Sequence, residues 1–104
     1  MNVDHAKARR ESLRWTIVLT LQNARPVGAH ESLILSTIQG VFPDATGLEL
    51  RRELDYLHDR LVVEVRKDPS GIWSAELTAL GVDIAEYTVD VHPGIARPTK
   101  YWAG

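Results

Sequence analysis

The stretch TGLELRRELDYLHDRLVVEV, residues 46–65, decides the fold because its hydrophobic period changes partway along. Its leucines recur at helical spacing and predict one buried stripe, formed by Leu50, Leu54, Leu57 and Leu61. Thr46 and Glu49 have the spacing of a capping box, in which Thr46 caps the first turn and Glu49 reaches back. From Leu61 the period shortens to two, so "LVVEVR" predicts a strand that follows the helix directly.

The chain after this strand predicts a β-hairpin. "KDPSG" contains turn-forming residues, and "IWSAEL" alternates again, with Trp73, Ala75 and Leu77 on one side. Thr78 then opens a predicted short helix, "TALGVDIAEYTV", in which Gly81 is unfavourable. Residues 91–104 hold two prolines and two glycines, which predicts an extended tail.

Two helices are predicted before the quoted stretch. Residues 9–24 carry one core stripe, made of Leu13, Ile17, Leu21 and Ala24. A second apolar set, Trp15, Val18 and Leu19, lies off that stripe, so we expect this helix to be covered on two sides. Residues 31–41 present a second face, Ile34, Ile38 and Val41, with Leu35 and Phe42 beside it.

This order of elements resembles the winged helix-turn-helix superfamily over residues 9–87. The resemblance implies a mainly α, α+β fold: a three-helix core, a two-stranded β-hairpin wing, a short C-terminal helix and an extended tail. We therefore expect one domain over residues 1–90, with a basic N-terminal arm at 1–12, and a tail at 91–104 that docks on the domain or on a partner. With its tail "HPGIARPTKYW", the whole chain also resembles small proteins of Mu-like phages and prophages.

Charge is unevenly distributed in a chain of 104 residues with a net charge of −2. Residues 1–30 carry +3, residues 31–90 carry −7, and the tail carries +2. Nucleic-acid-binding domains are usually basic, so this balance counts against simple DNA binding. The absence of cysteine, of a long apolar run and of a signal-peptide pattern predicts a cytoplasmic protein without disulfides.

The superfamily resemblance implies that the helix at 46–60 enters the DNA major groove. Arg52 is then the candidate for a base edge, because a guanidinium can bind guanine through two hydrogen bonds. The candidate contacts to the DNA backbone are Arg51 and Tyr56 on the helix, Arg66 and Lys67 before the wing turn, and Lys7, Arg9 and Arg10 in the arm, with Arg14 beside them.

A solvated helix surface is the alternative reading of these charges. The expected outward face holds Glu49, Arg52, Glu53 and Tyr56, with Arg51 and Asp55 at its edge. Arg51–Asp55, Arg52–Asp55 and Glu49–Arg52 have the spacing of helix ion pairs, which need no ligand. Four carboxylates (Glu49, Glu53, Asp55 and Asp59) would also face the phosphates of a bound duplex. A continuous positive strip that joins the arginines to the arm would favour DNA, and carboxylates that interrupt it would favour a protein partner.

Two further expectations concern partners. Trp15, Val18 and Leu19 either receive the tail, with Tyr101 and Trp102, or form the seam of a homodimer. The alternative to a DNA-binding regulator is a winged-helix protein-interaction module, such as a phage accessory or assembly factor.

No catalytic motif is present in the sequence. The four histidines share no metal-ligand spacing, and there is neither a phosphate-binding glycine loop nor a Gly-x-Ser-x-Gly elbow. We therefore expect a protein that is not an enzyme and needs no metal or cofactor.

Overall fold

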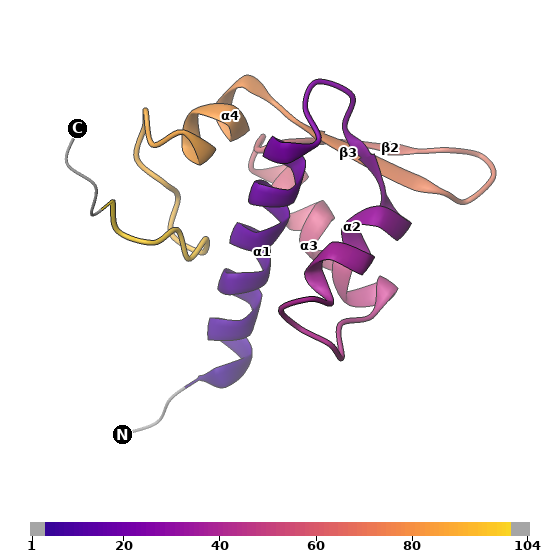
Figure 1. Ribbon diagram of the computed structural model, residues 1–104, viewed down its shortest axis with the longest axis horizontal. Coiled ribbons are helices and arrows are strands. Elements are labelled where there is room, and N and C mark those ends of the chain that lie inside the picture. Colours follow the sequence, from indigo (N-terminus) through magenta and orange to yellow (C-terminus); the bar gives the residue numbers. More distant parts are fainter. Residues whose placement is uncertain (1–3, 101–104) are drawn as a thin grey trace.

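The computed structural model describes residues 4–100, so the predictions for Tyr101 and Trp102 lie outside the described residues. The first helix, α1, spans His5–Asn23 and begins one turn earlier than predicted. Asp4 caps it by accepting a hydrogen bond from the Lys7 backbone amide at 3.0 Å. Most of the basic segment at 1–12 is therefore the first part of a helix that projects beyond the rest of the molecule (Figure 1).

The second helix, α2, spans Glu31–Ile38 and is shorter than predicted. Ile34 and Ile38 are fully buried, as their spacing indicates. Val41 is 62% exposed, so its predicted place on the buried face is wrong. The reason is that the helix ends at Ile38, and the chain has already turned away before Val41.

The third helix, α3, spans Gly47–Asp59, and the side chain of its N-cap Thr46 accepts from the Glu49 amide at 3.2 Å. Leu50, Leu54 and Leu57 are fully buried, as predicted.

Leu61 does not complete the buried stripe of α3, since it is 68% exposed. The Leu61 amide donates to the carbonyl of His58, and the Val62 amide donates to the carbonyl of Leu57. Together these bonds form a Schellman motif, which places Leu61 in the left-handed region with φ of 65°. The turn points this side chain into solvent and buries Val62 in its place.

The predicted hairpin is confirmed as β2, Val63–Lys67, paired antiparallel with β3, Trp73–Leu77. A third strand, β1 at Ala29–His30, pairs with the other edge of β3. The sheet therefore has three strands in the order β1-β3-β2, where the sequence predicts two. A two-residue strand is too short to leave an alternating pattern, so the sequence gives no sign of it.

The last helix, α4, spans Ala79–Ala85, and its N-cap Thr78 accepts from the Gly81 amide at 3.1 Å. Gly81 is required by packing rather than by helix propensity, because a Cβ there would collide with the Val62 carbonyl. Thr78 also donates to the Leu61 carbonyl at 2.6 Å, which joins α4 to the turn before β2.

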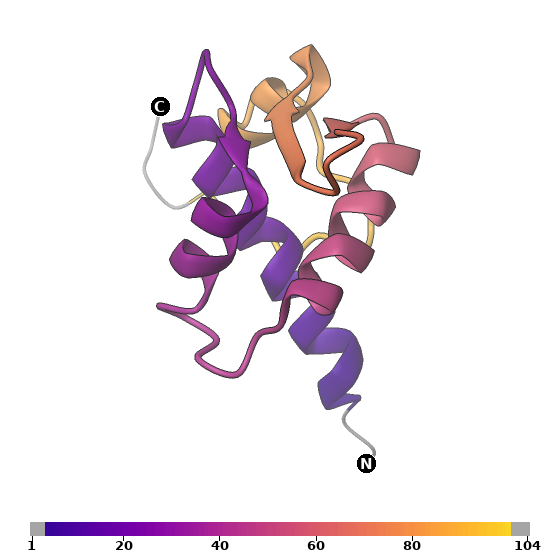
Figure 2. The ribbon, with the colours of Figure 1, turned by 90° about the vertical axis from the view of Figure 1, so that its right-hand side faces the viewer.

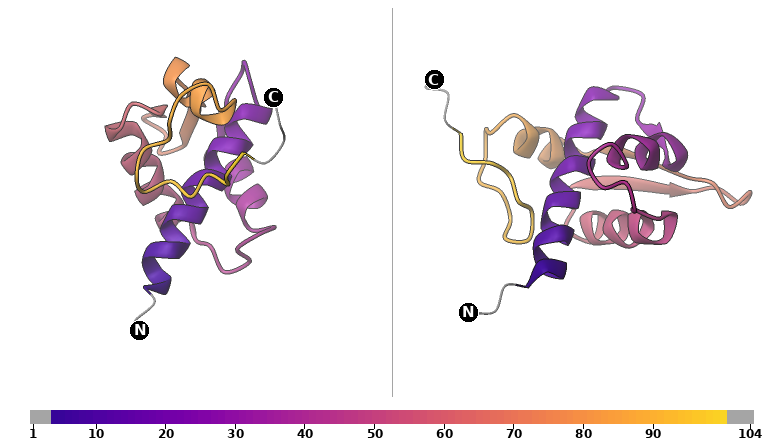
Figure 3. Two further views of the ribbon diagram at one scale, coloured as in Figure 1. Left: turned by 90° about the vertical axis from the view of Figure 1, so that its left-hand side faces the viewer. Right: turned by 60° about the horizontal axis from the view of Figure 1, so that its bottom comes forward.

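The elements form two layers about α1. The helices α2 and α3 lie on one side of α1 with the sheet, while α4 and the tail lie on the other (Figures 1 and 3). Trp15 and Val18 are buried within the chain, and Trp15 packs edge-on against Tyr87 with ring centroids 6.0 Å apart. Of the second apolar set, Leu19 alone reaches the surface, at 41% exposure.

The tail crosses α1 on the side away from α2 (Figure 3, left). Ile95 is its buried anchor, and the Ala96 amide donates to the Glu11 carbonyl of α1 at 3.0 Å. Further along the tail, the Arg97 guanidinium donates to the carbonyls of Ile84 and Val89, each at 3.0 Å, and so attaches the tail to α4 and the segment after it.

The predicted fold class, a mainly α, α+β winged helix-turn-helix, is confirmed. The order α1-β1-α2-α3-β2-β3 is that of a winged helix, with the β2–β3 hairpin projecting beyond the helices as the wing (Figure 1). Across residues 4–100, none of the helices combines the length and the apolar character that a bilayer crossing requires.

Candidate nucleic-acid interface

The solvent-facing stripe of α3 consists of Leu48, Arg52, Asp55 and Asp59, which recur at i, i+4, i+7 and i+11. This face is about a quarter-turn away from the one predicted. Of the residues expected to point outward, Arg52 is exposed, whereas Glu53 is only 4% exposed, and Glu49 and Tyr56 are partly buried. The buried leucines leave both glutamates on the flank that faces α1, where Arg9 and Arg14 satisfy their charges.

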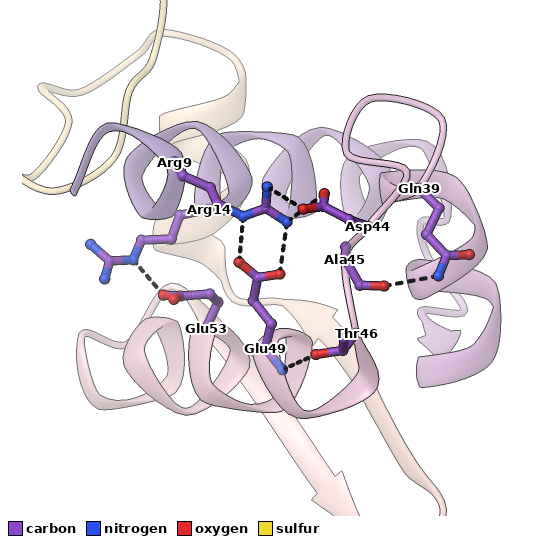
Figure 4. A network of polar contacts seen from close by, with 8 residues as sticks. All are labelled: Arg9, Arg14, Gln39, Asp44, Ala45, Thr46, Glu49 and Glu53. Carbon is purple, nitrogen blue, oxygen red and sulfur yellow. Dashed lines mark hydrogen bonds and ion pairs between the residues drawn. The ribbon is translucent and has the colours of Figure 1, made fainter. Parts of the chain in front are cut away.

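Glu49 faces α1, where it binds Arg9 through two hydrogen bonds of 2.7 and 3.0 Å (Figure 4). The Arg9 guanidinium also reaches Asp44 at 2.9 Å and lies 5.1 Å from the centre of the Phe42 ring. The hydrogen bonds from Arg9 lower the pKa of Glu49 below its ordinary value. A hydrogen bond from the Thr46 backbone amide lowers this pKa by a smaller amount, and that bond is the reciprocal half of the capping box. Arg9 therefore joins α1 to the turn before α3.

Glu53 and Arg14 form a buried ion pair between α3 and α1, with Nε and Oε1 2.7 Å apart (Figure 4). Arg14 also donates to the Gly94 carbonyl of the tail at 2.9 Å. The Tyr56 ring lies against two guanidinium groups, with Arg14 3.4 Å and Arg60 3.6 Å from its centre. The Tyr56 hydroxyl points to the Pro93 carbonyl at 3.5 Å, so this side chain contacts the tail instead of the outward stripe.

Arg51 lies between α2, α3 and the wing. Its guanidinium donates to both carboxylate oxygens of Glu31, at 2.8 and 2.7 Å, and to the Gly71 carbonyl at 2.7 Å. It also lies 4.6 Å from the centre of the Trp73 ring. Glu31 accepts a further hydrogen bond from the Trp73 backbone amide, and the bonds from Arg51 lower the pKa of Glu31. The ion pair Arg51–Asp55 suggested by their spacing is absent among the described contacts, because Arg51 turns toward Glu31.

Lys67 and Arg66 lie on opposite faces of the hairpin. Lys67 faces α3, binds Asp55 at 3.1 Å and lies 4.3 Å from the centre of the Trp73 ring. Arg66 is exposed on the outer face, and within residues 4–100 its side chain makes neither an ion pair nor a hydrogen bond. Arg52 is likewise exposed, with no such contact to the described residues, so neither suggested helix pair of Arg52 forms.

The basic residues of the arm, together with Arg14 beside it, form two groups. Arg9 and Arg14 are held by carboxylates of the domain, whereas Lys7 and Arg10 are exposed with no ion pair to any residue in the described range. Carboxylates therefore interrupt the positive strip at Arg9, Arg51 and Lys67, the pattern that favours a protein partner. Arg52 on α3 and Arg66 on the wing are the cations of these two elements that form no ion pair with residues 4–100.

Two contributors to this surface are not identified from the sequence: Glu31 and Trp73, which tie the wing to the helices. Glu31 stands in the first turn of α2, where the helix dipole alone accounts for a carboxylate, and its bond to Arg51 spans twenty positions of sequence. The alternating pattern around Trp73 predicts a half-buried strand residue, but it does not predict the contacts of Trp73 with the helices. Among residues 4–100, no three histidine, aspartate or glutamate side chains gather as metal ligands would.

No protein-family model and no curated protein sequence matches the chain. The fold is similar to the crystal structure of a candidate DNA-binding protein from Ralstonia eutropha JMP134. The two superpose with a TM-score of 0.63 at 21% sequence identity, over 75% of this chain and 95% of the other. This likeness shows that the two chains share a fold.

Proposed function

We propose that this protein binds duplex DNA, with α3 in the major groove and the wing beside it. The observation that carries the proposal is the setting of Arg52: an exposed arginine, unpaired within the described residues, at the middle of the outward stripe of α3. The candidate DNA-binding protein of similar fold supports the same class of ligand.

The main objection from the sequence is the set of four carboxylates on α3. The structure weakens it, because Glu49 and Glu53 face α1 and Asp55 is paired with Lys67. Asp59 is left at the far end of the stripe. A phosphate-binding surface therefore meets one unpaired carboxylate on this helix within the described residues, and not four.

Each candidate residue has a defined role in this proposal. Arg52 reads a guanine, which gives about 1–3 kcal/mol of discrimination against another base. Arg66 and Lys67 contact phosphates beside the wing, and Lys67 keeps Asp55 as a partner, because its ammonium group has three donors and can bind a carboxylate and a phosphate together. Lys7 and Arg10 add phosphate contacts from the projecting part of α1. Three of the candidate residues do not contact DNA in this proposal and instead fix the positions of the elements that do: Arg9, Arg51 and Tyr56.

The biological form that we propose is transcription regulation in a phage or bacterial setting. It involves no catalytic step, metal or cofactor.

The test is fluorescence anisotropy with random and genomic duplexes at low and moderate salt. We expect binding that weakens with salt, because phosphate contacts release counterions. Arg52→Ala should remove the preference for one sequence, and Arg52→Lys should retain charge without restoring that preference, since lysine cannot make the bidentate contact. Arg25→Ala, another exposed arginine, is the matched control. A protein that binds no duplex at low salt would contradict the proposal.

The arm is tested separately. Replacing Lys7 and Arg10 together by alanine should lower the slope of log affinity against log salt by about two, or about one for each lost phosphate contact. An unchanged slope would remove the arm from the interface and leave the role of α3 untouched.

A second candidate function is binding of a protein through the same face. The carboxylates that interrupt the positive strip favour it, as do Leu33 and Leu48, which are 57% and 62% exposed on α2 and α3. Absence of duplex binding in the assay above, from a folded protein, would favour this alternative.

A further inference from the structure

The strand β2 lies at an edge of the sheet, with β3 as its only neighbour in the described sheet. The Thr78 amide bonds to the Val62 carbonyl and the Asp68 amide bonds to the Ile72 carbonyl, so the even-numbered residues of this strand direct their backbone groups toward β3. Val63, Val65 and Lys67 therefore direct their amides and carbonyls away from the sheet. An open edge of this kind is a template for another strand.

The outer face of the same hairpin carries charges that its own sheet does not satisfy. Glu64 is directly opposite Glu76, and like charges in this position destabilise a strand pair. Arg66 is opposite Ser74. Both Glu64 and Arg66 are exposed, and neither forms an ion pair with any described residue.

We propose that β2 pairs antiparallel with β2 of a second copy of this chain, about a two-fold axis at Val65. Val65 then lies opposite Val65 of the second copy, and Glu64 lies opposite Arg66 of the second copy, twice by symmetry. The backbone groups match, since residues 63, 65 and 67 of both strands face the shared edge. The two sheets become one continuous sheet, and both copies contribute the same surface, as an isologous dimer requires.

Charge selects this register over its neighbours. Shifting the pairing to keep the backbone bonds moves the axis to residue 64 or to residue 66. The first shift places Glu64 opposite Glu64 of the second copy, and the second places Arg66 opposite Arg66 of the second copy. Each creates a like-charge pair where the register centred on Val65 makes two opposite-charge pairs.

The hairpin offers room for a second strand because it projects beyond the helices (Figure 1). Figure 2 looks along the hairpin from its tip. At its base the His58 ring donates to the outward carbonyl of Val63 at 3.3 Å, which leaves the edge most open at Val65 and Lys67. A short shared edge buries little surface, so the dimer is a weak one.

The test is sedimentation equilibrium of the whole chain, from low micromolar concentration upward. Glu64→Arg and Arg66→Glu should each weaken the dimer about tenfold or more, because each puts two like-charge pairs at the edge. The variant that combines both reversals should restore the wild-type dissociation constant, since opposite charges would again face each other across the shared edge. Val65→Pro should abolish pairing without removing a bond to β3, because the Val65 amide faces outward.

Two results would overturn the proposal. One is a wild-type monomer throughout; the other is a dimer that the single charge reversals leave unchanged, which would place the contact on another surface. Circular dichroism of each variant checks that the fold is retained. Arg66 also belongs to the proposed DNA interface, so sedimentation is run without DNA, and Glu64→Arg, a change outside that interface, tests the dimer by itself.

Discussion

Arg14 of α1 and Glu53 of α3 form an ion pair 2.7 Å long inside the molecule, where their side chains are only 9% and 6% exposed. The same arginine holds the tail through the Gly94 carbonyl and lies against the Tyr56 ring. One guanidinium thus fixes the rotation of α3 and the course of the tail together. Arg52 faces solvent because it lies opposite the buried leucines of α3, whereas Glu53 lies beside them and needs a buried partner.

Removing one partner of this ion pair should strongly destabilise the folded protein. Glu53→Gln leaves the buried Arg14 charge uncompensated, which should lower the free energy of unfolding by about 3–5 kcal/mol in urea titration. Glu64→Gln, at an exposed site, should change it by no more than about 0.5 kcal/mol. The double change Arg14→Met with Glu53→Leu should cost less than Glu53→Gln alone. Equal effects of Glu53→Gln and Glu64→Gln would show that the pair does not hold the fold.

Gly94 lets the tail pass close to Tyr56 and Arg14. Its φ is 101°, and a Cβ there would collide with the Tyr56 hydroxyl. Gly94→Ala should therefore destabilise the protein by about 1–3 kcal/mol and increase amide hydrogen exchange over residues 91–100. Gly47→Ala is the matched control: it adds a methyl group in open space at the start of α3 and should stabilise the protein by about 0.5–1 kcal/mol. The same sign for both variants would contradict this role of Gly94.

The local signals in the sequence predict most of the architecture and little of the site. Leu50, Leu54, Leu57 and the cap at Thr46 depend on neighbours within one helix, and they are placed as predicted. The orientation of Glu49 and Glu53 depends on Arg9 and Arg14, which are 40 and 39 positions away. Such distant partners leave no periodic trace. The outward face itself follows from the leucines, because at about 100° per residue the side opposite them holds Leu48, Arg52, Asp55 and Asp59. The predicted face is wrong by about a quarter-turn because it does not lie opposite this stripe.

Residues that are close in sequence also suggest ion pairs that do not form in this region. Arg51 and Asp55 have ideal helix spacing, yet each has a better partner in Glu31 and Lys67. A bidentate carboxylate contact with a further carbonyl satisfies Arg51 more completely than one exposed pair. Spacing therefore shows which pairs are possible, and packing decides which of them form.

Leu61 occupies a position where glycine is favoured. Its φ of 65° costs a leucine about 1–2 kcal/mol, and its exposed side chain contributes little packing. Leu61→Gly should raise the free energy of unfolding by up to about 1 kcal/mol, after the extra freedom of glycine in the unfolded chain is subtracted. Leu33→Gly, at a similarly exposed site inside α2, should lower it by about 1 kcal/mol. Thermal unfolding of both variants checks the contrast, and a loss of stability in Leu61→Gly would refute it.

Glu31 should make stability depend on pH below its ordinary pKa of 4.5. Its hydrogen bonds from Arg51 lower the pKa in the folded protein, so the unfolded chain binds the proton more readily. The stability that Glu31 contributes is therefore complete above pH 4.5 and is lost as the pH falls through the lowered folded value. Glu31→Gln should reduce stability at neutral pH and flatten its decline below pH 4.5. Urea unfolding at neutral pH, at pH 4.5 and about one unit lower measures both slopes, and parallel declines in wild type and Glu31→Gln would exclude Glu31 as the titrating group.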